Sequence, residues 1–120
     1  MIDLRRATRW SGLACILIIV ILSLLPANDM ARTGAPKWIE HFAAYAGTSF
    51  LLALGLRRPT FMLAIPIGLA ALSGAMEVLQ QLSPGRTMHL IDFLASSAGA
   101  LAGTVSAALA AVLMSSGART

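Results

Sequence analysis

The chain has 120 residues, of which 58% are hydrophobic and 12% are charged, and its formal net charge is +4 at pH 7. A soluble domain carries about 25% charged residues, so this composition indicates a single-domain integral membrane protein. The positive charge does not indicate nucleic-acid binding, because the basic residues stand between apolar runs and form no basic helix face. The one cysteine, Cys15, excludes a disulfide within the chain.

The first apolar stretch covers about residues 10–25 and follows three arginines. A helix of about 16 residues rises about 24 Å, slightly less than the roughly 30 Å hydrocarbon core, so interfacial Trp10 and the long arginine side chains would complete the span. A cleaved signal peptide is the alternative interpretation. It is disfavoured because Pro26 and the residues after it offer no small-x-small cleavage site.

Three further helices are predicted at about residues 38–56, 60–82 and 89–114. Pro59 separates the second from the third, and Pro84-Gly85 marks a tight turn before the fourth. Pro66 inside the third is compatible with a membrane helix, because neighbouring groups can satisfy the freed backbone. The predicted fold class is therefore all-α, an integral membrane four-helix bundle forming one membrane domain over residues 1–120.

The distribution of basic residues predicts the orientation of this bundle. The side that carries the termini holds six of them, Arg5, Arg6, Arg9, Arg57, Arg58 and Arg119. The opposite side holds three, Arg32, Lys37 and Arg86. Since the side richer in Lys and Arg stays in the cytoplasm, both termini are expected inside.

Polar residues gather at the ends of the last three helices that this topology places outside. An acid inside a span costs about 2.5–3.5 kcal/mol on insertion scales and usually faces protein or water, so Glu77 is expected to face other helices. The clustering on one side of the membrane predicts a ligand-binding site. Its candidate residues are His41, Tyr45, Glu77, Gln80, Gln81, Arg86, Asp92 and Ser96.

Each candidate also has a structural interpretation. Glu77 could pair with Arg86 or His41 to hold helices together, and Asp92 could cap its helix. The pair His89-x-x-Asp92 has metal-ligand spacing, but two candidate ligands are too few, so neither a metal nor a cofactor is predicted. No phosphate loop or nucleophile–base motif is present in the sequence, and no catalytic residue is assigned.

The fourth predicted helix carries a stripe of small and polar residues, Asp92, Ser96, Gly99, Gly103 and Ser106. The Ala95/Gly99 and Gly99/Gly103 spacings permit close helix packing. The first predicted helix has no such stripe and no polar residues at its outer end. We therefore expect it to be a peripheral anchor.

Four strings in this order, EHFAAYA (40–46), EVLQQ (77–81), PGR (84–86) and DFLASSAG (92–99), resemble the VanZ-like family of small bacterial membrane proteins. The resemblance covers about residues 37–103. Two positions depart from the family pattern: Pro36-Lys37 precedes the histidine where members often carry Asp-Lys, and Ser96 replaces a common asparagine. The resemblance implies a multi-pass protein of the bacterial inner (plasma) membrane, in a family whose founding member is linked to glycopeptide (teicoplanin) resistance.

These observations predict a protein whose outward-facing polar pocket binds or acts on a cell-envelope amphiphile, such as a lipid-linked intermediate, or a glycopeptide-related target. Arg86 would hold an anionic head group within the bilayer. Two alternatives stay open: a structural or interaction subunit of an envelope complex, and a membrane-embedded enzyme using Glu77, Asp92 and His41. A small multidrug transporter is disfavoured, because its essential carboxylate is expected deep in the first helix, where this chain has no charge.

Overall fold

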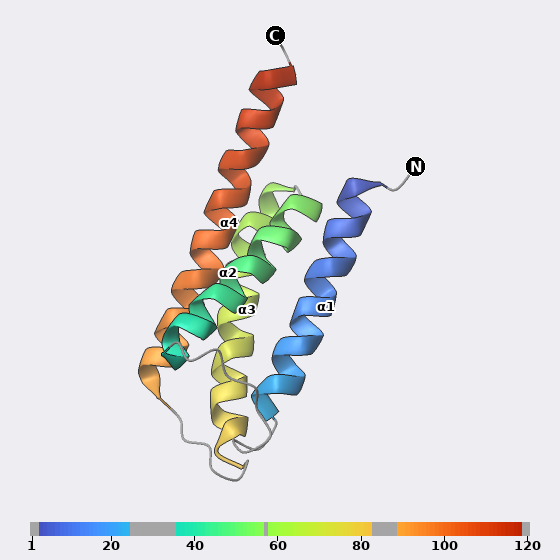
Figure 1. The fold of residues 1–120 in the computed structure, drawn as a ribbon. Coiled ribbons are helices and arrows are strands. Elements are labelled where there is room, and N and C mark those ends of the chain that lie inside the picture. Colours follow the sequence, from blue (N-terminus) through green and yellow to red (C-terminus); the bar gives the residue numbers. More distant parts are fainter. Residues whose placement is uncertain (1–2, 25–35, 57, 83–88, 119–120) are drawn as a thin grey trace.

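Four α-helices make up the part of the chain that the computed structural model describes, residues 3–24, 36–56, 58–82 and 89–118. They are α1 (Leu4–Leu24), α2 (Lys37–Gly55), α3 (Pro59–Gln80) and α4 (Leu90–Ala118). Successive helices run in opposite directions, so α1 begins and α4 ends toward the same end of the molecule (Figure 1). The prediction of an all-helical protein is confirmed for the described residues.

Three of these helices are long and apolar enough to cross a membrane: α1, α3, and the Leu90–Ser115 part of α4. This result indicates a membrane protein. The remaining helix, α2, is less apolar because it carries Lys37, Glu40 and His41 in its first turns and further polar residues beyond them. It contacts α4 most extensively and α1 next, and it also touches α3. A helix covered on several sides by other helices does not need an apolar surface all round.

The buried polar side chains in the middle of α2 satisfy their hydrogen-bonding groups locally. The Thr48 hydroxyl donates to the Ala44 carbonyl at 2.7 Å, and the Ser49 hydroxyl donates to the Ala46 carbonyl at 3.1 Å. Thr48 and Ser49 are both almost fully buried. These intrahelical hydrogen bonds let α2 bury hydroxyl groups without partners on other helices.

The packing of α4 against α2 depends on two glycines. A Cβ atom at Gly99 would overlap the backbone of Phe42, and one at Gly103 would overlap the Ala46 carbonyl and the Ser49 hydroxyl. The expectation that the Gly99/Gly103 spacing permits close helix approach is therefore confirmed.

Beyond Gly103, the stripe along α4 departs from its predicted course. Ser106 is exposed, and Ala107 is buried in its place. Ala107 stands four residues beyond Gly103, and at 3.6 residues per turn a four-residue step keeps a residue close to the same face of a helix.

The first helix is the most exposed of the three candidate spans. Only 11% of the 18-residue apolar stretch of α1 is buried, against 33% for the corresponding stretch of α3 and 28% for that of α4. Its contacts with α2 include the approach of Gly12 to Leu52 and a 2.9 Å hydrogen bond from Arg9 Nε to the Gly55 carbonyl. The low burial of α1 agrees with the peripheral position expected for it, and its role as an anchor stays a prediction.

Two helices extend beyond their apolar runs. α1 begins at Leu4, ahead of Trp10, and the Arg5 amide donates to the Asp3 carboxylate at 3.1 Å. α4 continues past Met114 to Ala118. Arginine is a good helix former and a carboxylate near the N-terminus satisfies a free amide, so α1 starts before its apolar part. The apolar pattern marks the part of a helix suited to lipid and does not mark the helix ends.

Candidate functional site

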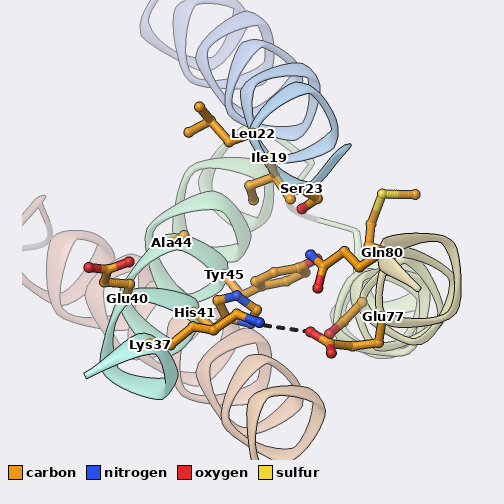
Figure 2. A pocket seen from close by; sticks show the side chains of 12 residues that line it. Ile19, Leu22, Ser23, Lys37, Glu40, His41, Ala44, Tyr45, Glu77 and Gln80 are labelled. Carbon is orange, nitrogen blue, oxygen red and sulfur yellow. Dashed lines mark ion pairs between the residues drawn. The ribbon is translucent and has the colours of Figure 1, made fainter. Parts of the chain in front are cut away.

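A pocket of about 110 Å³ lies between α1, α2 and α3. The α1 side of the pocket is mainly apolar, with Ile19 and Leu22 beside the hydroxyl of Ser23, and Met76 of α3 adds one more apolar side chain. In Figure 2, Ile19 and Ser23 of α1 lie across the pocket from Tyr45 of α2 and Gln80 of α3. The pocket therefore places an apolar surface opposite a polar one.

The polar wall comes from α2 and α3. His41 and Tyr45 stand four residues apart on α2, so they share a face, and Ser73, Glu77 and Gln80 share a face of α3. The Tyr45 side chain is hydrogen-bonded to that of Ser73. The Gln80 side chain is 1% exposed, and its Oε1 atom has no hydrogen-bond partner among the described residues. A buried carbonyl oxygen left in this state is available to a donor that enters the pocket.

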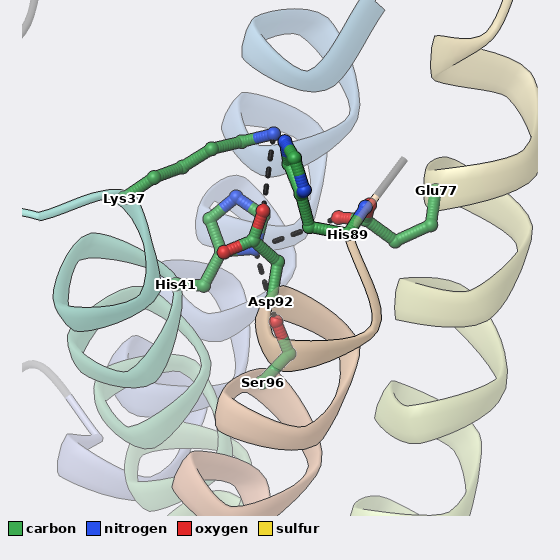
Figure 3. A network of polar contacts seen from close by, with 6 residues as sticks. All are labelled: Lys37, His41, Glu77, His89, Asp92 and Ser96. Atoms are coloured by element: carbon green, nitrogen blue, oxygen red, sulfur yellow. Dashed lines mark hydrogen bonds and ion pairs between the residues drawn. The ribbon is translucent and has the colours of Figure 1, made fainter. Parts of the chain in front are cut away.

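A network of charged and polar side chains continues from this wall to α4 (Figure 3). Lys37 Nζ lies 3.2 Å from Asp92 Oδ2, with the Lys37 side chain 21% exposed and the Asp92 side chain 3% exposed. Asp92 Oδ2 accepts no hydrogen bond from any residue that the structure describes. The two groups thus form an ion pair whose geometry is not that of an aligned hydrogen bond.

His41 is the centre of the second part of the network. Its Nδ1 atom lies 3.7 Å from Glu77 Oε1 and 3.3 Å from the Ser96 hydroxyl, so one imidazole contacts α3 and α4 from α2. The other Glu77 oxygen, Oε2, accepts a hydrogen bond from the His89 amide at 3.3 Å. The network therefore links three helices near the end of the molecule away from the start of α1 and the end of α4.

The formal charges in the network do not balance. Lys37 contributes one positive charge, whereas Glu77 and Asp92 contribute two negative charges, and both carboxylates are buried. His41 is neutral unless it is protonated. With a neutral imidazole, the described part of this cluster carries an excess of one negative charge. A buried excess charge is costly, so the site favours an additional cation or a donor-rich ligand.

The structure brings most of the predicted site residues together. His41, Tyr45, Glu77 and Gln80 line the pocket, while Asp92 and Ser96 belong to the adjoining network without lining it.

Two of the predicted site residues, Gln81 and Arg86, are not among these, and Glu40 lines the pocket without joining the network. Gln81 is exposed and does not line the pocket, since it follows the last residue of α3, whereas Gln80 is directed inward. The Glu40 carboxylate points away from Glu77 in Figure 2. Arg86 lies outside the described residues.

A group of possible metal ligands differs from the pair considered in the sequence. One ligand atom each from His41, Glu77 and Asp92 lie within 4.8 Å of one another, and His89 is not part of this group. These three residues come from three helices, so no spacing along the chain identifies them. A histidine and two carboxylates are a donor set suited to a divalent metal ion.

Two contributions to the site, the Lys37 ammonium and the apolar side chains of α1, were not predicted from the sequence. Lys37 was counted as a loop cation, although its position one turn before His41 was a signal that it shares the face of the cluster. The contribution of α1 to the apolar wall has no local signal, because Ile19 and Leu22 resemble any other apolar residues of a membrane helix.

No protein-family model, no curated protein and no solved structure matches this chain. The fold and the site define a helical protein with three candidate membrane spans and a buried polar cluster beside a small two-sided pocket. Its function is therefore inferred from the geometry of that pocket.

Proposed function

We propose that this chain is a four-helix membrane bundle whose pocket binds the polar head group of a cell-envelope amphiphile. The observation that supports this function is the pocket itself, which has an apolar wall from Ile19, Leu22 and Met76 and a polar wall from His41, Tyr45, Glu77 and Gln80. An amphiphile has the same two-sided character. Its polar group would meet the buried hydrogen-bonding side chains while its apolar part lies along α1 and α3.

In the proposed topology, α2 is the fourth span and both termini are in the cytoplasm. The alternating directions of the helices support an even number of crossings (Figure 1). The extensive contacts of α2 with α4 and α1 support a membrane position for a helix that is less apolar than its neighbours. Together with the excess of basic residues on the side of the termini, this topology opens the pocket toward the outer face.

The size of the pocket limits what can enter it. A free volume of about 110 Å³ holds several water molecules or one small polar group, so the pocket would take a fragment of a head group and not a complete glycolipid head. The resemblance to VanZ-like proteins supports a bacterial inner-membrane location and a lipid-linked envelope intermediate or a glycopeptide-related target as the class of ligand. Arg86 stays a candidate for binding an anionic part of that ligand.

Lipid analysis of the purified protein tests this function. The native chain and Glu77→Gln would be purified from a bacterial membrane in mild detergent, and the co-purifying lipids would be identified by mass spectrometry. The native chain is expected to retain one class of amphiphile at about one molecule per chain. Glu77→Gln is expected to retain at most about a tenth of that amount, since a hydrogen bond to a charged group is worth about 1.5–3 kcal/mol.

Asp3→Asn is the matched control, because it removes a carboxylate at the opposite end of the molecule, where Asp3 contacts the Arg5 amide. It should retain the amphiphile at the native level. Equal lipid profiles for the native chain, Glu77→Gln and Asp3→Asn would contradict the proposed function.

A further inference from the structure

We infer that His41, Glu77 and Asp92 form a binding site for one divalent transition-metal ion, such as Zn²⁺ or Mn²⁺, where α2, α3 and α4 meet. This inference goes beyond the proposed function and does not depend on the identity of any amphiphile. The first argument is convergence. One imidazole and two carboxylates from three separate helices place their ligand atoms within 4.8 Å of one another, about one turn from the helix ends.

The distances inside the group are compatible with ligands of a single ion. Metal–ligand bonds to His nitrogen and carboxylate oxygen are about 2.0–2.2 Å long, so two ligand atoms on one ion lie roughly 3–4 Å apart. The distance from His41 Nδ1 to Glu77 Oε1 is 3.7 Å, within that range and too long for a good hydrogen bond. Small side-chain movements would bring the Asp92 carboxylate to the same centre.

A second, independent observation concerns the Asp92 carboxylate. Asp92 is 2% exposed, and its Oδ2 atom accepts no hydrogen bond from the described residues. Buried carboxylate oxygens are normally hydrogen-bonded or bound to a cation. The Lys37 ammonium at 3.2 Å supplies positive charge here, but it does so without an aligned hydrogen bond. Oδ2 is therefore a buried ligand atom within the cluster that no hydrogen bond from the described residues occupies.

The charge of the cluster supports the same conclusion. With neutral His41, the three ligands carry two negative charges, which a divalent ion neutralises. The Lys37 ammonium competes with a metal ion for the Asp92 carboxylate, because it lies 3.2 Å from Oδ2 and would repel a second cation there. Metal binding therefore requires the flexible Lys37 side chain, which is partly exposed, to move toward solvent.

The remaining coordination positions give the site its chemical character. Structural zinc sites have four protein ligands, whereas a site with three protein ligands keeps a position open. His41 and Glu77 line the pocket, so the open position would face it. The ligand class that such an ion would take is a small oxygen donor, such as water or a phosphate or carboxylate group.

The experiment uses the full chain in detergent micelles after treatment with a chelator. Binding of Mn²⁺ is followed by electron paramagnetic resonance, and binding of Zn²⁺ by calorimetry, both without any assay of activity. The native chain is expected to bind one ion. Single substitutions His41→Ala, Glu77→Gln and Asp92→Asn should each lower the affinity by at least about tenfold, whereas Asp3→Asn should leave it unchanged.

Lys37→Met separates a metal site from a purely structural network. Loss of the competing ammonium should raise the affinity for the ion by about tenfold or more, and a misfolded protein cannot produce that gain. Absence of saturable binding by the native chain at millimolar ion would overturn the inference. Equal or weaker binding by Lys37→Met, or an equal loss in Asp3→Asn, would overturn it as well. Adding chelator to the purification for the lipid analysis keeps that test independent of these outcomes.

Discussion

Lys37 Nζ and Asp92 Oδ2 lie 3.2 Å apart and join the first turn of α2 to the first turn of α4. The same two helices are held close together further along by Gly99 and Gly103. The ion pair is thus formed at one end of the most extensive contact between the described helices. The α2–α4 contact therefore positions the part of the polar network that joins these two helices.

Removal of the Lys37 ammonium should destabilise the metal-free protein. Lys37→Met leaves the buried Asp92 carboxylate without its cation, and we expect the free energy of unfolding to fall by about 1–3 kcal/mol. This is less than the roughly 3–5 kcal/mol for a fully buried pair, because the Lys37 side chain is 21% exposed. The measurement is denaturant unfolding followed by circular dichroism in detergent with chelator.

Two further variants show whether this loss belongs to the pair. The double variant Lys37→Met with Asp92→Asn removes both charges and should recover at least half of the loss. Arg58→Met removes a positive charge at the start of α3, where the described residues show no ion pair with it, and should have little effect. Equal losses in Lys37→Met and Arg58→Met would show that the pair has no specific role.

The glycine contact between α2 and α4 should be the part of the fold most sensitive to a single methyl group. Gly103→Ala would drive a Cβ atom into the Ala46 carbonyl and the Ser49 hydroxyl, so we expect a loss of about 1–3 kcal/mol in the free energy of unfolding. Gly47→Ala is the control, because a Cβ atom at Gly47 meets no atom within 4 Å. Unfolding midpoints that fall equally in both variants would contradict the close α2–α4 packing.

The proposed orientation makes a direct prediction about the C-terminus. A reporter that is active only in the cytoplasm, fused after Thr120, should be active, because the basic residues on the side of the termini retain that side in the cytoplasm. A reporter active only outside the cytoplasm should be silent at the same position. The reverse pattern would contradict the N-in/C-in topology.

Hydropathy and residue spacing predicted much of the fold. The apolar runs indicated α1, α3 and α4 because a helix that contacts lipid must be apolar along its length. α2 is harder to assign by hydropathy, since its buried hydroxyls are satisfied within the helix at Thr48 and Ser49. The close packing at Gly99 and Gly103 was predictable because small residues four apart in a membrane helix usually lie at a helix–helix contact.

The candidate site was predictable only in part. Spacing placed His41 with Tyr45, and Glu77 with Gln80, because residues three or four apart share a helix face. It could not show that Asp92 meets Lys37, or that Ile19 of α1 faces this cluster, because such contacts depend on which helices are neighbours and at what rotation. The same spacing predicted that Gln81 lies on the face of Glu77. This was wrong because α3 ends at Gln80 and the Gln81 side chain is exposed.

Filling the pocket without changing any charge is the most direct test of its proposed role. Ala43 and Ala44 are both exposed, but only Ala44 lines the pocket. Ala44→Phe should therefore occupy the space of a head group, and Ala43→Phe should add the same side chain outside it. The measurement is the amount of amphiphile that co-purifies with each variant, determined by mass spectrometry beside the unfolding midpoint. We expect Ala44→Phe to lose the bound amphiphile with an unchanged midpoint while Ala43→Phe retains it; equal retention by both variants would contradict binding in this pocket.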